Sequence, residues 1–341
     1  MTEKRVCVIG DGGWGTTLAL LLHRRGVKTT LWSAFPEQVD ELRRLGENRR
    51  YLPGIPLPEG LGVTADPFEA ARGVDLAISV VPTQFLRGVA ERFEDALAGD
   101  VPLATATKGI EIETFRTPSE ILQEVLGERR MAVISGPSHA EEVAAGLPAS
   151  VVVASKDADF AGEVQSVISS DTFRVYTHSD PKGAELAGAL KNVIALAAGI
   201  SDGLALGDNA KAALITRGIV EMARFGQAHE ASPRTFFGLA GIGDLMTTCY
   251  SSHSRNRRVG EEVGRGKRLA DVLEEMQMVA EGVWTTKALF GPEADARGIP
   301  MPIAEQVHAV LFDGKDPREA VTVLMGREPS GEMEGLLGGG V

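Results

Sequence analysis

One lysine stands alone in an apolar, helix-like stretch of the sequence. Between residues 186 and 201 the only charged residue is Lys191, which is surrounded by alanine, glycine and leucine. Burying an ammonium group is costly unless the group has a partner or a task. Desolvation lowers the pKa of a lysine, which suits proton exchange near neutral pH. Lys191 is therefore a candidate acid/base, and the alternative is a lysine that reaches solvent from its helix edge.

A polar cluster follows between residues 241 and 258. Its candidate site residues are Asp244, Thr248, Ser254, Arg255 and Asn256. Arginine and hydroxyl groups suit a phosphate ester, because the arginine fork matches two phosphate oxygens. A carboxylate near Lys191 would hold the orientation of that lysine. The same residue types also fit a solvated basic helix end.

A glycine-rich loop lies near the start of the chain. Gly10, Gly12 and Gly15 have the spacing G-x-G-x-x-G between a strand-like run and a helix-like run. The first glycine permits a tight turn, the second lets the backbone approach a pyrophosphate, and the third lets helix and strand pack closely. The N–H groups and dipole of the helix then face the phosphates. We expect a dinucleotide site, against the alternative of a structural strand–helix turn.

The end of the second expected strand bears on the choice between NAD and NADP. NAD-specific sites commonly carry an acid there that binds the ribose 2′-hydroxyl. Here the strand ends Trp32-Ser33-Ala34-Phe35, and the first acid is Glu37. Arginine and histidine are also absent from these positions. The sequence therefore permits NADP without demanding it.

Two further expected strands are followed by polar residues. Lys108 follows the strand at 102–107, and Gly136, Ser138 and His139 follow the next one. Ligands bind at the carboxyl edge of open parallel sheets. Lys108 therefore either contacts a substrate anion or carbonyl, or is an exposed loop lysine. His139 is either an acid/base or a structural residue at a helix start.

The composition favours a cytoplasmic globular enzyme. The 341 residues are 43% hydrophobic with a net charge of −12, which argues against a nucleic-acid partner. An anionic substrate then needs a local positive cluster. Cys7 and Cys249 lack partners at metal-ligand spacing, so we expect neither a metal site nor a disulfide. The amino-terminal apolar run is too short for a signal peptide. The stretch around Lys191 is shorter than the roughly 20 residues that span a bilayer, so we expect a buried helix without membrane insertion.

Strand-like and helix-like patterns alternate in the first half of the chain. Short β-branched apolar runs predict strands, and amphipathic patterns predict helices. The expected strands are 5–9, 29–32, 76–81, 102–107, 131–135, 150–153 and 173–176. The expected helices include 17–25, 35–45, 118–126, 140–145 and 159–169. This alternation predicts an α/β domain over residues 1–181 with a parallel, doubly wound sheet.

The second half has no convincing strand pattern. Glycine and proline separate successive helical segments. The expected helices are 182–198, 209–225, 233–239, 255–264, 269–276, 285–297, 303–311 and 317–325. We expect an all-helical substrate domain at 182–330 and a flexible tail at 331–341.

Together these motifs resemble one family. In chain order they are Gly10-x-Gly12-Gly13-Trp14-Gly15-Thr16, Ala106-Thr107-Lys108-Gly109, Ile134-Ser135-Gly136-Pro137-Ser138, Leu190-Lys191-Asn192-Val193, Asp208-Asn209-x-Lys211-x-Ala213-Leu214, Gly243-Asp244-Leu245 and Ser254-Arg255-Asn256. The combination resembles the bacterial type of NAD(P)-dependent glycerol-3-phosphate dehydrogenase over residues 6–326. The resemblance implies a Rossmann domain, a helical domain of the 6-phosphogluconate dehydrogenase type, and a homodimer.

The resemblance also implies a reaction and a set of contacts. The reaction is reversible hydride transfer between C2 of sn-glycerol 3-phosphate and the nicotinamide of NAD or NADP, run toward glycerol 3-phosphate for phospholipid synthesis. Lys191 becomes the acid/base on the C2 oxygen. The implied substrate positions are Lys108, Gly136, Ser138, Lys191, Asp244, Thr248, Ser254, Arg255 and Asn256. The implied cofactor positions are Gly10, Gly12, Gly13, Trp14, Gly15, Ala34, Lys108, Ala140, Arg255, Val279 and Glu281.

Two departures and two alternatives accompany the resemblance. Gly13 replaces a commoner serine, which removes a hydroxyl contact to the pyrophosphate, and Ala34 stands where many relatives have His or Arg. One alternative is a related two-domain dehydrogenase that acts on another hydroxy acid or sugar acid. Ser254, Arg255 and Asn256 favour a small phosphate ester over it. The other is a non-catalytic nucleotide sensor, against which the isolated Lys191 argues.

Overall fold

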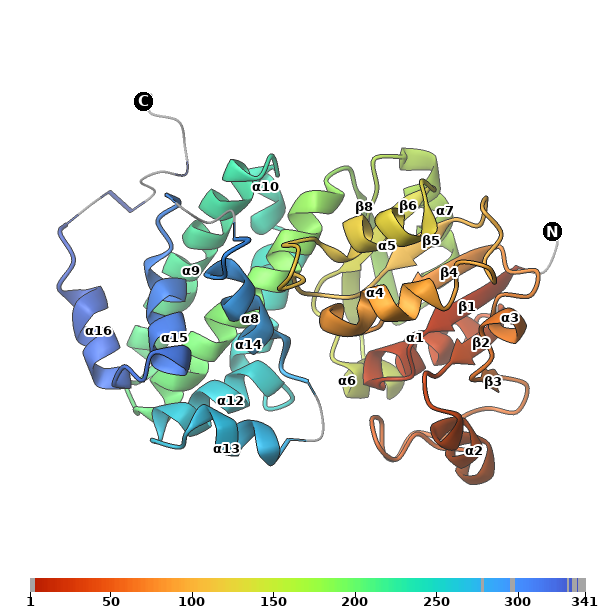
Figure 1. The fold of residues 1–341 in the computed structure, drawn as a ribbon, viewed down its shortest axis with the longest axis horizontal. Coiled ribbons are helices and arrows are strands. Elements are labelled where there is room, and N and C mark those ends of the chain that lie inside the picture. The colour runs from red at the N-terminus through yellow and green to blue at the C-terminus, as the bar shows by residue number, and fades with distance from the viewer. Residues whose placement is uncertain (1–3, 277–278, 295–297, 330, 333–335, 337–341) are drawn as a thin grey trace. The chain divides into compact units, whose positions relative to one another are not determined.

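The computed structural model describes residues 4–276, 279–294, 298–329, 331–332 and 336. The chain divides into two compact units (Figure 1). The first comprises 1–107 and 118–181, and the second comprises 108–117 and 182–341. The short segment 108–117 thus groups with the helical unit, although strands of the first unit precede and follow it in the sequence.

The first unit is built on an eight-stranded sheet in the order β3-β2-β1-β4-β5-β6-β7-β8. The strands are β1 (Arg5–Ile9), β2 (Lys28–Trp32), β3 (Gly62–Thr64), β4 (Leu76–Ser79), β5 (Leu103–Thr105), β6 (Met131–Ser135), β7 (Ala149–Ala154) and β8 (Phe173–His178). The first six strands along the chain pair in parallel. β7 pairs antiparallel with β6 and parallel with β8.

The reversal at β7 corrects the expectation of a wholly parallel sheet. α6 (Ala140–Ala144), which joins β6 to β7, has only five residues. At 1.5 Å per residue this is roughly 7.5 Å of helix. The five residues of β6 span roughly 16 Å, so this helix is too short to return the chain along the strand, as a parallel crossover requires. β7 therefore starts at the edge where β6 ends and runs back beside it.

Helices accompany the strands of the first unit. They are α1 (Gly13–Arg24), α2 (Pro36–Leu45), α3 (Pro67–Ala70), α4 (Thr83–Glu91), α5 (Pro118–Leu126), α6, and α7 (Ala158–Ile168). Alternate residues of β1 enter two different apolar clusters, with Val6 and Val8 in one and Cys7 and Ile9 in the other. Successive strand residues point to opposite faces, so both faces of the sheet are buried. Cys7, on one of these faces, is a buried free thiol.

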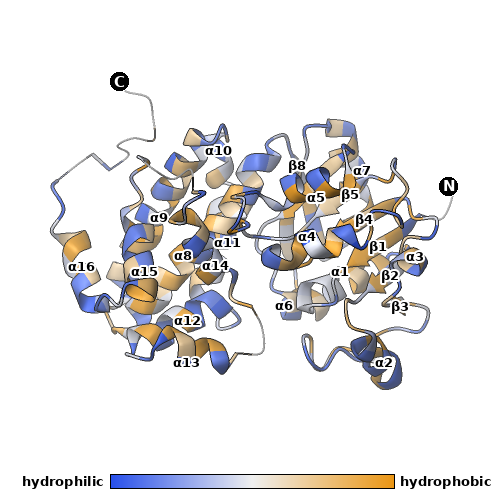
Figure 2. Cartoon of the chain, viewed as in Figure 1, coloured by the Kyte–Doolittle hydropathy of each residue, from blue (hydrophilic) through white to orange (hydrophobic). Residues whose placement is uncertain are grey.

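Three elements of the first unit, β3, α3 and α4, were not among those expected. β3 has three residues that begin with glycine, too few for an alternating pattern. α3 has four residues. α2, in contrast, matches its prediction closely and is drawn mainly in the hydrophilic colour in Figure 2. The remaining expected strands and helices of this unit are confirmed with ends shifted by a few residues.

The second unit contains no strand among its described residues. Its helices are α8 (Pro181–Gly203), α9 (Asp208–Ala228), α10 (Pro233–Phe236), the π-helix η1 (Leu239–Gly243), α11 (Asp244–Tyr250), α12 (Arg255–Gly264), α13 (Leu269–Glu274), α14 (Glu281–Leu289), α15 (Pro302–Phe312) and α16 (Pro317–Met325). α8 is long and apolar enough to cross a membrane, but 94% of its most apolar window is buried within the protein. The expectation of a buried helix is confirmed.

The helix expected at 285–297 is wrong at both ends. α14 begins at Glu281 and ends at Leu289, just before Gly291 and Pro292. Proline cannot continue a helix interior because it lacks an N–H group. Residues 295–297 lie outside the described part. The expected tail also lies largely outside it, although Arg217 donates a hydrogen bond to the carbonyl of Glu332 and Leu336 is buried.

Candidate active site

The glycine loop has the geometry of a phosphate-binding turn. Gly10 has a φ of +113°, and a Cβ on Gly15 would lie 1.8 Å from the carbonyl oxygen of Gly10. A Cβ on Gly12 would meet no atom within 4 Å. No side chain caps α1, and no acid stands in its first turn. The turn therefore fits a pyrophosphate, which helix N–H groups and the helix dipole favour.

The structure gives a physical reason for the glycine at position 13. A Cβ on Gly13 would lie 2.8 Å from the carbonyl oxygen of Tyr51. A serine there would require the segment that contains Tyr51 to move. The neighbouring Trp14 is half-buried and packs on the apolar core, with its ring centroid 6.1 Å from that of Phe173. Trp14 therefore contributes to the packing of the apolar core.

The other first-unit positions lie at the ends of β2 and β6. Gly136 is buried with a φ of +131°, and the Ser138 hydroxyl donates to its carbonyl at 3.0 Å. His139 directly precedes α6, which begins at Ala140. The carbonyl of Ala140 accepts a hydrogen bond from the Thr17 hydroxyl of α1 at 3.1 Å. These contacts anchor α6 beside the glycine-loop helix.

Four side chains of the second unit form a compact charged cluster. Lys191 of α8 is only 6% exposed, and its Nζ donates to Asp244 Oδ1 at 2.6 Å and to Thr248 Oγ1 at 2.7 Å. Lys108 Nζ donates to the other carboxylate oxygen of Asp244, also at 2.6 Å. Two ammonium groups thus share one buried carboxylate. This is the local positive cluster that an anionic substrate needs in an acidic protein.

Burial and charge set the pKa values of this cluster. Desolvation lowers the pKa of Lys191 to about 8, with the nearby Lys108 charge acting in the same direction and Asp244 opposing it. Burial alone raises the pKa of Asp244, but the two ammonium groups outweigh it and hold the pKa below its ordinary value. Lys191 can therefore gain or lose a proton near neutral pH beside a carboxylate that stays charged.

A second set of contacts links α8, α12 and α14. Asn256 Nδ2 donates to Asn192 Oδ1 at 2.9 Å, and the Gly282 N–H donates to Asn256 Oδ1 at 2.9 Å. Ser254 caps α12 by accepting from the Arg257 N–H at 3.2 Å. The amide of Asn256 is thus occupied by protein partners. Asn192, the polar neighbour of Lys191 in the same apolar stretch, was not among the predicted site residues, although its side chain contacts one of them, Asn256.

Arg255 contacts a different segment from the cluster of Lys108, Lys191, Asp244 and Thr248. Its side chain is exposed at the start of α12, and Nη1 donates to the carbonyl of Val279 at 2.9 Å. Val279 stands two residues before Glu281, the first residue of α14. The structure therefore joins Arg255 and the segment leading into α14, two positions that the resemblance assigns to cofactor binding.

Comparison with known proteins gives a consistent family assignment. Residues 5–161 match the profile described as NAD-dependent glycerol-3-phosphate dehydrogenase N-terminus, and residues 180–322 match that of its C-terminus. A "glycerol-3-phosphate dehydrogenase [NAD(P)+]" of Syntrophotalea carbinolica is 51% identical over 330 residues, which cover 96% of this chain and 99% of that protein. A protein of the same name from Geobacillus thermodenitrificans is 49% identical over 98% of each chain.

A solved structure agrees with these sequence relatives. The glycerol-3-phosphate dehydrogenase of Coxiella burnetii is 40% identical and superposes with a TM-score of 0.91, covering 95% of this chain and 99% of that one. Matches of this length and identity include both the sheet unit and the helical unit.

Proposed function

The chain belongs to the NAD-dependent glycerol-3-phosphate dehydrogenase family, and we propose that Lys191 is the acid/base of its reaction. The protein is an oxidoreductase that interconverts sn-glycerol 3-phosphate and dihydroxyacetone phosphate with NAD(P)(H). It supplies glycerol 3-phosphate for glycerophospholipid synthesis. The observation that carries the proposal is the buried Lys191, with its pKa lowered to about 8 and its Nζ 2.6 Å from Asp244.

The proposed task of Lys191 is proton transfer at the C2 oxygen. When bound, the nicotinamide ring exchanges a hydride with C2 of the substrate. In reduction the Lys191 ammonium gives a proton to the C2 oxygen, and in oxidation the neutral amine takes one. Asp244 and Thr248 accept hydrogen bonds from Nζ and so fix its direction. Their positions on α11 hold the amine of α8 in place between transfers.

The remaining site residues have proposed binding tasks. Lys108 adds positive charge beside Asp244, which suits a substrate with a phosphate group. Arg255 offers an exposed guanidinium, whose planar fork matches phosphate oxygens. The other substrate and cofactor positions are proposed on the family resemblance, with Ser254 and Asn256 also needed to hold α12. Backbone N–H groups of the glycine loop are proposed to bind the pyrophosphate.

Replacement of the lysine tests the proposed function. In Lys191→Ala we expect kcat for dihydroxyacetone phosphate reduction to fall by about 10²-fold or more. The dissociation constant of NADH, measured by calorimetry, should stay near that of the wild type. Lys287→Ala, which removes an exposed lysine of α14, is the matched control. A near-normal kcat in Lys191→Ala would contradict the assignment.

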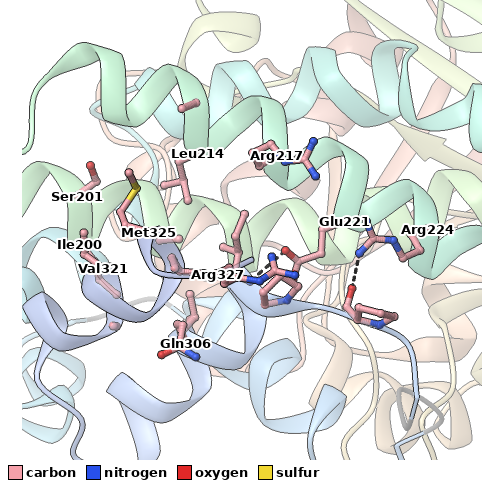
Figure 3. Close-up of a pocket in the computed structure, with 18 of the residues that line it drawn as sticks. Ile200, Ser201, Leu214, Arg217, Glu221, Arg224, Gln306, Val321, Met325 and Arg327 are labelled. Atoms are coloured by element: carbon pink, nitrogen blue, oxygen red, sulfur yellow. Dashed lines mark hydrogen bonds between the residues drawn. The ribbon is translucent and has the colours of Figure 1, made fainter. Parts of the chain in front are cut away.

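We also propose a cytoplasmic homodimer. A groove of about 1160 Å³ lies in the helical unit between α8, α9, α15 and α16 (Figure 3). Leu214, Ile303, Val321 and Met325 are among its apolar lining residues, and Met325 is 81% exposed. Contacts between copies that cover such a surface would remove apolar area from water. Light scattering of the purified protein tests this proposal, and a monomer at micromolar concentration would contradict it.

A further inference from the structure

An acid stands beside the carboxyl end of β2, and it comes from the glycine loop. β1 and β2 pair in parallel with Ile9 opposite Trp32, and the Gly10 N–H donates to the Trp32 carbonyl at 3.0 Å. This register sets Gly10 opposite Ser33, and the side chain of Asp11, the next residue of the loop, interacts with Ser33. NAD-specific Rossmann sites bind a ribose hydroxyl with an acid at this end of the second strand. Here the nearby acid, Asp11, belongs to the glycine loop that follows the neighbouring strand β1.

The backbone of Asp11 is fixed by its surroundings. Its carbonyl oxygen accepts from Asn48 Nδ2 at 2.7 Å and from the Thr16 hydroxyl at 3.1 Å. Asn48 Nδ2 also donates to the Thr16 hydroxyl at 2.8 Å. Residues from the loop, from α1 and from the segment after α2 thus converge here. These hydrogen bonds fix the backbone from which the Asp11 side chain projects.

The Asp11 carboxyl is buried with unused hydrogen-bonding capacity. The residue is 6% exposed, and within the described part of the chain its Oδ2 has no hydrogen-bond partner. Burial raises the pKa of this carboxyl, while a hydrogen bond with Ser33 and the charge of Arg50 act in the opposite direction. A buried acceptor that lacks a donor costs free energy. A ligand hydroxyl group would supply the missing donor.

We propose that Asp11 accepts a hydrogen bond from the adenosine ribose of the cofactor and selects NAD(H) against NADP(H). This inference deepens the proposed function, because it assumes that the glycine loop binds the dinucleotide. A 2′-phosphate removes the 2′-hydroxyl and adds a charge of about −1.5 to −2. That charge would stand against the carboxylate, so the site discriminates by repulsion as well as by attraction.

Two arginines near Asp11 and the end of β2 determine how NADPH affinity should change when the acid is removed. Arg50 is exposed and electrostatically coupled to Asp11. Arg92 is exposed, donates to the Ala34 carbonyl at 3.3 Å, and lies over the Trp32 ring at 4.7 Å. With the Asp11 charge removed, these guanidinium groups can attract a 2′-phosphate, and no carboxylate at position 11 repels it. Loss of the acid should therefore improve NADPH binding, beyond weakening NADH binding.

Calorimetric titration of Asp11→Asn with NADH and with NADPH tests the inference. We expect the ratio of their dissociation constants to move toward NADPH by about tenfold or more, which is roughly 1.4 kcal/mol. Asp11→Ser, which also lacks the charge, should move the ratio in the same direction. Glu37→Gln is the control, since Glu37 is the exposed acid next in the sequence after β2. Its ratio should match that of the wild type.

The outcomes separate this inference from the function beneath it. An unchanged ratio in both Asp11 variants would overturn the inference, and so would an equal loss of affinity for both coenzymes. Dihydroxyacetone phosphate reduction by the wild type is assayed in parallel. If the wild type binds NADH but does not reduce dihydroxyacetone phosphate, the proposed function fails. The ratios of dissociation constants still test whether Asp11 selects between the two coenzymes.

Discussion

The contacts of Lys191 show how one buried carboxylate can accept hydrogen bonds from two ammonium groups. One carboxylate oxygen of Asp244 accepts a hydrogen bond from Lys191, and the other accepts one from Lys108. Breaking a buried ion pair by removing one partner typically costs about 3–5 kcal/mol. The shared carboxylate keeps Lys191 charged at pH 7, yet burial brings its pKa down to about 8. The proton on Nζ is therefore held in place but can be released.

The lowered pKa predicts opposite pH profiles for the two directions of the reaction. Reduction needs the Lys191 ammonium, so kcat/KM for dihydroxyacetone phosphate should fall as pH rises through about 8. Oxidation needs the neutral amine, so kcat/KM for glycerol 3-phosphate should rise through the same value and level off above it. Steady-state rates between pH 7 and 10 measure both. Profiles that run in the same direction, or show no change in this range, would contradict proton transfer by Lys191.

At this scale the sequence predicted some contacts and not others. The isolation of Lys191 in an apolar stretch indicated burial, and the structure confirms it. The convergence of Lys108 on Asp244 was not predictable, because 136 positions separate them and the segment 108–117 groups with the helical unit. Asp11 escaped notice for a related reason. Its side chain interacts with Ser33 across two parallel strands, and the pairing of those strands cannot be read from one strand alone.

Among the elements, α8 and α12 approach so closely that their backbones touch through glycines. A Cβ on Gly199 would lie 2.0 Å from the carbonyl oxygen of Arg257, and one on Gly260 would lie 2.0 Å from that of Leu196. α8 carries Lys191 and α12 begins at Arg255. Glycines at the crossing therefore set the distance between two helices that both bear proposed site residues.

Replacing a crossing glycine should harm both stability and activity. In Gly260→Ala the added methyl group meets backbone that cannot yield, so α8 and α12 must separate, at a cost of about 1–3 kcal/mol. We expect a lower Tm by differential scanning fluorimetry and a kcat reduced by about tenfold or more, since small misplacements of reacting groups are costly. Gly162→Ala in α7 is the matched control, because its Cβ would meet nothing within 4 Å. Equal behaviour of the two variants would contradict this account.

The same elements explain where prediction from sequence stops. Apolar runs such as β1 and β6 had the boundaries expected, because strands buried on both faces read as continuous apolar segments. The prediction that β7 runs parallel to β6 was wrong. The direction of β7 depends on the length of α6 and not on any residue of β7 itself. The π-helix η1 was not expected either. Gly241 lies there with its Cα against the backbone of Phe236, where a Cβ would come within 1.9 Å of a carbonyl oxygen.

For the molecule as a whole, net charge and local charge have opposite signs at the site. The chain carries a formal charge of −12. Lys108 and Lys191 together exceed Asp244 by one positive charge, since two cations share one anion. An anionic substrate is thus repelled by the protein in general and attracted to this cluster. Such attraction is screened by salt over a Debye length of about 8–10 Å.

A buried glutamate makes the stability of the helical unit depend on pH. Glu221 of α9 is 2% exposed and lies in the wall of the groove (Figure 3). Its carboxylate accepts from the N–H groups of Ile303 and Ala304 at 3.0 Å each, and so caps the start of α15. Burial nevertheless raises its pKa from 4.5 to about 7, because the two N–H groups and Arg224 only partly offset the desolvation.

The raised pKa determines the sign of the effect. Between pH 4.5 and about 7 the folded protein binds more protons at Glu221 than the unfolded chain does. Its contribution to stability is therefore fully present below pH 4.5 and is lost as pH rises through about 7. A shift of this size corresponds to at most roughly 3 kcal/mol. Glu221→Gln cannot titrate, so the Tm of the wild type relative to this variant should fall by several degrees between pH 5 and 8. Glu274→Gln, at an exposed position of α13, should run parallel to the wild type. If Glu221→Gln also ran parallel, Glu221 would be charged throughout this range, and its two backbone donors would outweigh its burial.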